Sequence, residues 1–486
     1  MKTNIKLIVA AISLCFSGTA VAQQFSSSYF MEGSLYRHEL NPAFIGTQNY
    51  FSMPFLGNVH VSANGNLGVG DILFNKGGKT VTLLHPDVSL NEAMKNLNEN
   101  NKFLENVSLP VFSVGFSSFG GFNTIGLNVR EFAGFHFGDD FVELLKELKN
   151  DKSYNIGQIG VQAQAFLELA FGHSRNLKEV DENLNVGAKV KLLFGAARAN
   201  AELDDLTLNL GKDKWTATAH ARGEINAKGI EITQKYEKYN DESKNTKTDP
   251  KTGEKYGYET VDELKTNNAG LGGFGLAFDL GAEYDFKDLV PGLKASMSLL
   301  DLGFISWSES HVVENNGESF KFEGFKNIQV KDGAGTPMSD QTDKIKDDLM
   351  NLYRMENKGN VGSSTHGIGA TMNIGVEYTL PYYEPIRFGL LSTTRFQGDY
   401  SWNEERLSVN YAPCNWFEMN INGALGTFGP SFGWMLNLHP VGFNFFIGMD
   451  HLKTRVSKDF IPLNSNSDIT LGISFPLNAA PKKTYN

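Results

Sequence analysis

The sequence predicts an all-β protein, a transmembrane antiparallel β-barrel of about 14 strands, or 16 if two further segments cross, with short helices in long extracellular loops. Three observations support this prediction. Apolar residues recur at every second position in many separate stretches. The first 22 residues have the features of an export signal. The 486 residues contain no run of about 18 apolar residues, which a membrane helix would need.

The alternation is clearest over residues 365–380. Successive side chains of a strand point to opposite faces, so this stretch presents one apolar face and one small or polar face. It is also longer than the roughly 5–6 residues of an ordinary strand and sufficient for the roughly 9–11 residues of a bilayer crossing. The apolar set is Ile368, Ala370, Met372, Ile374, Val376, Tyr378 and Leu380.

Residues 1–22 carry Lys2 and Lys6 near their start, continue with an apolar stretch at 7–16 and end in Ala20-Val21-Ala22. This order predicts a signal peptide cleaved after Ala22 and a location in the outer membrane. Cys414 would then be the only cysteine, which excludes an internal disulfide and a cysteine-rich metal site. The net charge of −11 argues against a nucleic-acid partner.

We expect four regions along the chain. Residues 1–22 are the signal peptide, and residues 23–48 form an N-terminal lead or periplasmic plug. Residues 49–478 form the outer-membrane barrel, and residues 479–486 form a periplasmic tail. Outer-membrane lipid is therefore an expected partner.

Fourteen stretches have the alternation or the turn-bounded length of a strand. They are residues 50–63, 110–119, 122–136, 158–172, 184–195, 271–286, 293–307, 364–380, 385–397, 403–411, 415–427, 430–439, 441–451 and 467–478.

Two stretches fit this pattern poorly. Residues 196–230 could supply two more crossings or a hairpin above the membrane, and the short piece at 206–212 favours the hairpin. Residues 231–268 are dense in charged and amide side chains and lack apolar periodicity, so they are interpreted as a solvated, even disordered, loop.

The long insertions carry helix signals. Ser89 and Glu92 have the spacing of a capping box, and Asp139 or Asp140 could cap a second helix. Apolar residues at helical spacing over 345–352 predict a third. If strand directions alternate, four long insertions fall on one side and the short turns on the other, as in outer-membrane barrels. The four insertions are residues 64–108, 137–157, 227–270 and 308–362.

No motif predicts an enzyme, a cofactor or a metal site. Residues 172–176, around His173, lack the second glycine of a nucleophile elbow. The glycines at 270, 272 and 275 have dinucleotide-binding spacing, but they lead into a strand with no helix behind it, so a phosphate cradle is absent.

The polar face of the strands supplies the candidate binding residues. Charges of both signs on the inner wall could select solutes, or could pair across the lumen and brace the wall; the sequence leaves both readings open. The lumen-facing candidates are Glu168, Lys189, Lys191, Asp279, Glu283, Glu377, Arg387, Arg395, Glu418 and Asp450.

Two short motifs carry a family resemblance: Asn41-Pro42-Ala43 near the mature N-terminus and Leu300-Asp301-Leu302-Gly303-Phe304-Ile305-Ser306-Trp307. With the export signal and helix-bearing loops, they resemble an uncharacterised outer-membrane barrel family of Bacteroides-type bacteria. That family is similar in style to the outer-membrane long-chain fatty-acid transporters. The resemblance implies a hydrophobic ligand and an N-terminal hatch that contains Asn41, Pro42 and Ala43. The larger outer loops depart from it and leave the ligand class open.

Three functions follow as hypotheses. The first is passive transport or capture of a small solute, with hydrophobic solutes among the candidates. The second is a structural or accessory barrel that anchors surface or secretion partners through its loops. The third is a soluble, secreted β-rich binding protein.

Overall fold

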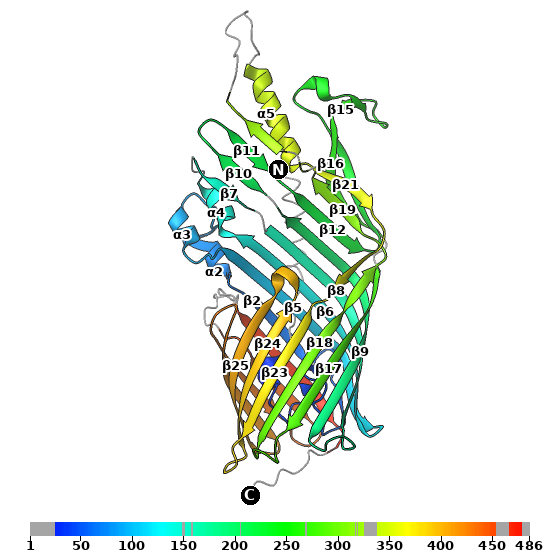
Figure 1. Ribbon diagram of the computed structural model, residues 1–486. Helices are drawn as coiled ribbons and strands as arrows, with labels where there is room; N and C mark the ends of the chain where they lie inside the picture. The colour runs from blue at the N-terminus through cyan, green and yellow to red at the C-terminus, as the bar shows by residue number, and fades with distance from the viewer. Residues whose placement is uncertain are drawn as a thin grey trace, which may run out of the picture.

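The computed structural model describes residues 25–147, 151–156, 159–204, 206–267, 270–315, 317, 319–324, 338–452 and 466–478. Within these residues the chain forms a closed antiparallel β-barrel with a hydrophilic superstructure at one end (Figure 1). The predicted signal peptide, its cleavage site and the C-terminal tail lie outside the described residues.

Sixteen strands of the described residues build the wall. β1 and β2 share one place between β29 and β5, and β12 and β17 share one place beside β9, so the ring has fourteen places. The predicted barrel of about 14 strands, or 16, is confirmed with sixteen strands, although the two extra strands come from interrupted places and not from two further full crossings within residues 196–230. In ring order the strands are β1 (Tyr50–Ser52) with β2 (Val59–Gly65), β5 (Asn100–Ser118), β6 (Gly121–Gly138), β8 (Ile159–Asn176), β9 (Leu184–Leu203), β12 (Ala221–Ala227) with β17 (Gly273–Asp285), β18 (Leu293–Trp307), β23 (Ala370–Thr379), β24 (Ile386–Phe396), β25 (Trp402–Cys414), β26 (Phe417–Gly426), β27 (Ser431–Leu438), β28 (Asn444–Met449) and β29 (Ser467–Pro476).

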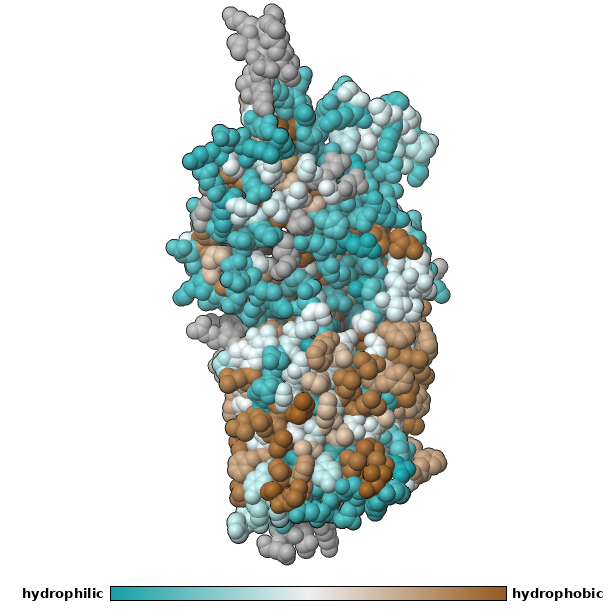
Figure 2. Space-filling model, in the orientation of Figure 1, coloured by the Kyte–Doolittle hydropathy of each residue, from teal (hydrophilic) through white to brown (hydrophobic). Residues whose placement is uncertain are grey.

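The outer surface of the wall carries an apolar belt. In β23, Ile374 and Val376 are 44% and 42% exposed, whereas the alternating Asn373 and Glu377 are 2% and 3% exposed. Figure 2 shows apolar residues gathered over the lower half of the barrel and hydrophilic residues over the upper half. Among the described residues, no helix combines the length and hydropathy of a membrane crossing.

The superstructure extends from the upper ends of β5, β6, β8 and β9, which run beyond the apolar belt (Figures 1 and 2). It contains strands that continue the wall, small separate sheets and helices. The strands that continue the wall are β19 (His311–Asn315), β21 (Met355–Asn360) and β22 (Ser364–Gly367). The separate sheets are formed by β7 (Ser153–Asn155), β10 (Thr207–Leu210), β11 (Trp215–Thr218) and β20 (Ser319–Phe322), by β3 (Leu73–Lys76) with β4 (Lys79–Thr82), and by β14 (Lys247–Thr248) with β15 (Lys255–Tyr256). The helices are α2 (Val69–Ile72), α3 (Leu90–Met94), α4 (Asp139–Lys146) and α5 (Met338–Tyr353).

The helix predictions hold with one correction. Ser89 Oγ accepts a hydrogen bond from the backbone N–H of Glu92 at 3.2 Å and caps α3. α4 begins where expected, but its N-cap is Gly138 without a side-chain cap, and Asp139 and Asp140 lie in its first turn. In the first turn, their negative charges stabilise the helix by interacting with the positive end of its dipole.

The interpretation of residues 231–268 as a solvated loop is wrong. β13 (Ile230–Glu237) and β16 (Tyr258–Thr266) pair as a hairpin. Ile232 and Val261 are buried against Val313 of β19, so a few apolar residues at strand spacing fix a segment whose overall composition is polar.

The ambiguous stretch 196–230 divides into three parts. β9 runs on to Leu203, β10 and β11 form the hairpin outside the barrel wall, and β12 returns to pair with the upper half of β9. Two predicted strands are also interrupted. The first breaks between β1 and β2, where Phe55 has φ +60°, and the strand predicted at 364–380 breaks at Gly369, with φ +81°.

A buried aspartate joins α5 to the loop that follows β13. Asp347 is fully buried, and its carboxylate accepts hydrogen bonds from the N–H and side-chain amide of Asn240 at 2.8 and 2.9 Å and from the N–H of Asp241 at 3.1 Å. Burial raises the pKa of Asp347, but these hydrogen bonds outweigh burial and hold the pKa below its ordinary value.

Asp347→Asn should release the loop after β13, because an amide cannot accept all three bonds; the loss is about 2 kcal/mol. Limited proteolysis should cut the mutant within residues 238–257 faster than wild type. Because the folded pKa is depressed, wild type should keep its protection above the unfolded pKa and lose it as the pH falls through the folded value. Asp348→Asn is the control, and equal cutting of all three proteins would contradict the assignment.

Candidate functional site

Residues 25–48, called the N-terminal segment below, lie inside the barrel (Figure 1). The segment contains two short 3₁₀ turns, η1 (Ser26–Ser28) and η2 (Arg37–Glu39), and no strand. Its backbone–backbone hydrogen bonds in the described structure all join residues of the segment to each other. The wall therefore holds the segment through side chains and through packing.

Aromatic and aliphatic side chains of the segment fill hollows of the inner wall. Phe25, Met31, Leu35 and Tyr36 form one buried cluster with four wall residues, which are Tyr50, Phe122, Met435 and Phe446. A second cluster joins Leu391 of β24 to Tyr29, Phe30, Leu40 and Phe44. Burial of these rings supplies apolar contact that an inner wall of polar residues would otherwise lack.

Glycines of the wall allow the segment to approach this closely. A Cβ atom at Gly281 would lie 2.0 Å from Asn41 Oδ1, and one at Gly187 would lie 1.9 Å from the carbonyl oxygen of Pro42. In the same way, a Cβ atom at Gly375 would lie 2.6 Å from the ring of Tyr29, and one at Gly389 would lie 2.2 Å from the ring of Phe30. These positions are notches shaped to the segment.

The predicted hatch residues lie at these notches. Asn41 is fully buried, and its Nδ2 donates to the carbonyl oxygens of Ala282 and Met297 at 3.3 and 3.2 Å. Asn41 Oδ1 accepts from the N–H of Ala43 at 2.9 Å, which fixes the turn through Pro42. The Asn-Pro-Ala motif therefore binds the segment to two neighbouring strands, β17 and β18.

Charged residues of the wall hold the first part of the segment. Asp450 accepts hydrogen bonds from the N–H groups of Ser26 and Ser27 at 2.6 and 2.7 Å. Glu418 accepts from the N–H of Gly33 at 2.8 Å. Backbone N–H groups bound to a carboxylate form some of the stronger hydrogen bonds in proteins.

An ion-pair group surrounds Glu32 of the segment. Arg387 contacts Glu32, Glu418 and Glu377 at 3.2, 2.5 and 3.8 Å, and Lys294 contacts Glu32 at 3.1 Å. Glu377, Arg387 and Glu418 are all at most 3% exposed, so each charge depends on its partners rather than on water.

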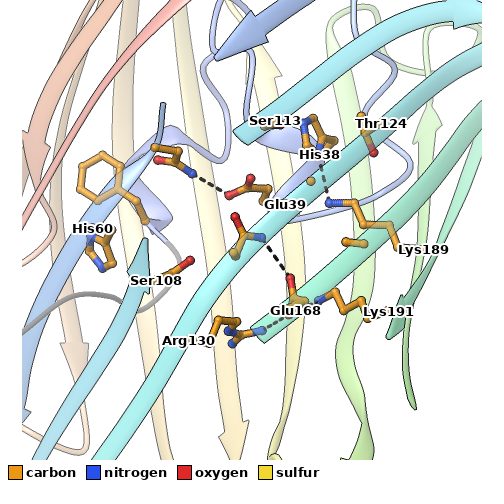
Figure 3. Close-up of a pocket in the computed structure, with 15 residues that line it drawn as sticks. His38, Glu39, His60, Ser108, Ser113, Thr124, Arg130, Glu168, Lys189 and Lys191 are labelled. Carbon is orange, nitrogen blue, oxygen red and sulfur yellow. Dashed lines mark hydrogen bonds and ion pairs between the residues drawn. The ribbon is translucent and has the colours of Figure 1, made fainter. Parts of the chain in front are cut away.

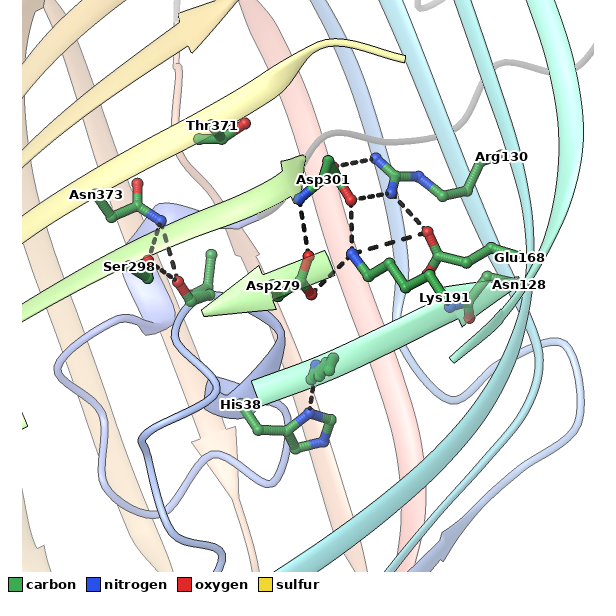
Figure 4. Close-up of polar contacts among 12 residues, drawn as sticks. His38, Asn128, Arg130, Glu168, Lys191, Asp279, Ser298, Asp301, Thr371 and Asn373 are labelled. Atoms are coloured by element: carbon green, nitrogen blue, oxygen red, sulfur yellow. Dashed lines mark hydrogen bonds and ion pairs between the residues drawn. The ribbon is translucent and has the colours of Figure 1, made fainter. Parts of the chain in front are cut away.

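A second ion-pair network crosses the barrel around Asp301 (Figure 4). Its carboxylate accepts hydrogen bonds from both terminal nitrogens of Arg130 at 2.8 and 2.9 Å and from Lys191 Nζ at 2.6 Å. Arg395 forms an ion pair with the same carboxylate at 3.4 Å. Lys191 also contacts Asp279 at 2.8 Å. Glu168 completes the network through Arg130 at 2.7 Å, giving three cations and three anions.

Asp301 was not among the predicted lumen residues. It lies in an irregularity of β18 with φ +58°, where the register against β17 shifts. The shift turns Asp301 onto the inner face and reverses the phase of the alternation: Ser298 and Leu300 are buried before it, and Ile305 and Trp307 after it. A lone aspartate within the apolar run 299–305 was the available signal. Arg130 was also missed as a site residue, although it stands on the polar face of its predicted strand.

A cavity of about 70 Å³ lies between η2 and the wall (Figure 3). His38, Glu39, Lys189 and Glu168 line it, and Lys189 Nζ lies 3.0 Å from His38 Nδ1. The last predicted residue, Glu283, lies at a larger cavity, where its carboxylate accepts from Asn185 Nδ2 at 2.8 Å. The structure thus places all ten predicted side chains on the inner side of the wall, in pairs or beside these two cavities.

A third cluster joins β25 to β29 near the upper rim. Arg406 pairs with Glu404 at 2.5 Å, and His451 lies between Glu404 and Asp468. None of these four was predicted. Glu404 and Arg406 lie two residues apart on one face of β25, but their partners His451 and Asp468 come from distant segments that only the fold brings beside them. Among the described residues, no group of His, Cys, Asp and Glu side chains is arranged to hold a metal ion.

Asp301→Asn should destabilise the barrel strongly, because Arg130, Lys191 and Arg395 would lose a buried counter-charge; the cost is about 3–5 kcal/mol. The temperature at which the refolded protein loses its compact form on SDS gels should fall. Asp301→Asn with Arg395→Gln should recover part of the loss, since it removes one cation as well. Asp399→Asn, at an exposed position, is the control, and a wild-type transition for Asp301→Asn would refute the role given to the network.

Two solved structures of bacterial transporters are similar at a low level. The toluene transporter TodX of P. putida matches with a TM-score of 0.39 and 9% identity, over 93% of this chain and 95% of that chain. The toluene transporter TbuX of Ralstonia pickettii matches with a TM-score of 0.36 and 9% identity, over 90% and 92%. At these values the likeness bears on neither solute nor mechanism. No curated protein matches the sequence.

A protein-family model matches residues 42–450. The match begins within the Asn-Pro-Ala motif of the N-terminal segment and extends through the wall strands β1 to β28. Because it covers most of the chain, the chain belongs to this family, a family of unknown function (DUF5723).

Proposed function

We propose that this chain spans the outer membrane and passes a small solute when the N-terminal segment moves from its seat. One observation carries the proposal: the segment fills a closed barrel, yet only side-chain contacts and packing join it to the wall. The segment can therefore leave without breaking any strand pair. Contacts of this kind open at lower free energy than the β-ladder itself.

The membrane location is supported by the apolar belt. Phe278, Leu302, Leu390 and Leu407 are 46–62% exposed on neighbouring outer faces, and such side chains favour hydrocarbon over water. A soluble secreted protein would rarely expose a belt of this extent, so that alternative is disfavoured. In outer-membrane barrels the short turns face the periplasm. By this rule the superstructure stands outside the cell, and the C-terminal end of the N-terminal segment faces the periplasm.

The inner wall offers two kinds of surface to a solute. Departure of the segment would uncover Tyr50, Phe122, Met435 and Phe446, where an apolar solute could replace the segment's own rings. The ion-pair networks flank this strip, so the passage would be polar around it. A small solute with an apolar part, such as the resemblance implies, suits this arrangement.

An accessory barrel is the second candidate function. The superstructure is folded rather than loose, since α5 and the β13–β16 hairpin are tied through Asp347, and a rigid surface suits a protein partner. Crosslinking in cells should then recover one partner in stoichiometric amount, and its absence would leave the passage as the better account.

A hydrolase has little support. His366 Nε2 contacts both Ser364 Oγ at 3.0 Å and Glu224 Oε1 at 3.1 Å. A serine triad needs the acid and the serine on opposite ring nitrogens, so this cluster lacks the required order.

Gly187→Ala with Gly281→Ala should open the barrel, because both Cβ atoms would occupy space held by Asn41 and Pro42. In planar bilayers, wild type should conduct little and the double mutant should show frequent openings. Neither glycine has a positive φ, so alanine leaves the strands unstrained.

Gly126→Ala is the matched control on the inner wall, where an added Cβ meets nothing closer than 3.9 Å. It should behave as wild type. A double mutant that folds, keeps its compact form on SDS gels and stays closed would sink the proposed passage.

A further inference from the structure

The larger cavity, of about 330 Å³, lies at the short-turn end of the barrel. The segment contributes Arg37, Phe44 and Ile45 to its lining, and the wall contributes Asn185 and Glu283 among others. Its volume falls within the range of small-molecule sites, about 300–1,000 Å³.

Arg37 presents a positioned but uncommitted guanidinium to this cavity. Its Nε donates to the carbonyl oxygen of Tyr29 at 2.9 Å, and its guanidinium carbon lies 4.1 Å from the centre of the Phe44 ring. Among the described residues, no carboxylate forms an ion pair with it. The planar fork is thus held in place with N–H groups to spare, which is the arrangement that binds a carboxylate in a bidentate manner.

Glu283 is the matching anion. One carboxylate oxygen accepts from Asn185 Nδ2, and no cation of the described residues forms an ion pair with it. The other charged residues at the cavity are committed elsewhere: Glu32 binds Lys294 and Arg387, and Glu418 binds Arg387. One cation and one anion therefore remain for a ligand.

We propose that this cavity binds a small zwitterion with a carboxylate and an ammonium group, a free amino acid or a short peptide. The carboxylate binds Arg37 and the ammonium group binds Glu283, while Phe44, Ile45 and Ala412 surround the apolar part. Such a ligand neutralises two half-buried charges at once, which no ligand with a single charge does.

The site has a consequence for the segment. Because Arg37 belongs to the segment and Glu283 to the wall, the bound zwitterion bridges the two and holds the segment in its seat. Ligand binding and segment seating then strengthen each other to the same extent. This goes beyond the proposed passage, because the site is complete while the barrel is closed.

The test uses the full mature chain in detergent and the dipeptide alanyl-leucine as the probe, titrated by calorimetry. N-acetyl-alanyl-leucine lacks the ammonium group, and alanyl-leucine amide lacks the carboxylate. Each should bind about tenfold more weakly or worse, because each leaves one charged group unpaired. Equal affinity for all three, or no binding of alanyl-leucine at millimolar concentration, would overturn the proposal.

Two variants assign the ends of the ligand. Arg37→Gln should abolish the preference for alanyl-leucine over its amide, and Glu283→Gln should abolish the preference over the acetylated form. Arg175→Gln, at the end of β8, and Glu179→Gln, in the turn that follows, leave both preferences intact. A variant that changes both preferences or neither would contradict the assigned contacts.

Cys414 gives an independent readout, since this free thiol lines the cavity. Alanyl-leucine should slow its reaction with a maleimide in wild type and leave the rate in Glu283→Gln unchanged. Conductance is recorded separately. Ligand binding without any opening of the glycine double mutant would refute the passage alone, and opening without binding would refute this site alone.

Discussion

The structure depends on one constraint: the inner face of the wall is polar, and most of it is shielded from water. Asn373, Glu377, Asp279 and Asp450 are at most 3% exposed, so their hydrogen bonds must come from the protein. Two sets of groups supply them. Opposite wall charges pair with each other, and the N-terminal segment provides further donors and acceptors. The closed ring and the segment inside it therefore specify each other.

This constraint also separates the parts that move from the parts that stay. Backbone hydrogen bonds in continuous ladders hold the wall, whereas the segment is held by carboxylates such as Asp450 and Glu418, by the amide of Asn41 and by ring packing. Loss of the segment would expose polar groups of the wall to water, which can replace the lost hydrogen bonds. The energetic cost of opening is then mainly the lost apolar burial of the segment.

The two-residue alternation predicted the wall because lipid outside and polar groups inside impose the same rule on every crossing. It failed where a local feature outweighed that rule. Asp301 reaches the interior through a register shift, and Ile232 with Val261 orders a hairpin whose composition resembles a loop. The hatch motif and the ten candidate residues could be named from the sequence. Their partners could not, because Arg130 meets Asp301 and His451 meets Glu404 only through the register and arrangement of strands that are far apart in the sequence.

The glycines of the polar face had a second meaning that alternation does not reveal. Gly375 belongs to the small or polar face of the stretch 365–380, yet it provides the space that the ring of Tyr29 occupies. Gly281 does the same for Asn41. Depth along the strand and the path of a distant segment decide this role, and neither is encoded in the local pattern.

Hydrogen–deuterium exchange at the backbone amides of Ser26, Ser27 and Gly33 tests the central claim most directly. These three amides donate to Asp450 and Glu418 inside the barrel. In the intact protein in lipid, the account predicts that they exchange far more slowly than exposed loop amides, yet faster than the ladder amides of β24 and β25. Exchange at the rate of an unstructured peptide would contradict the claim that the segment fills the barrel.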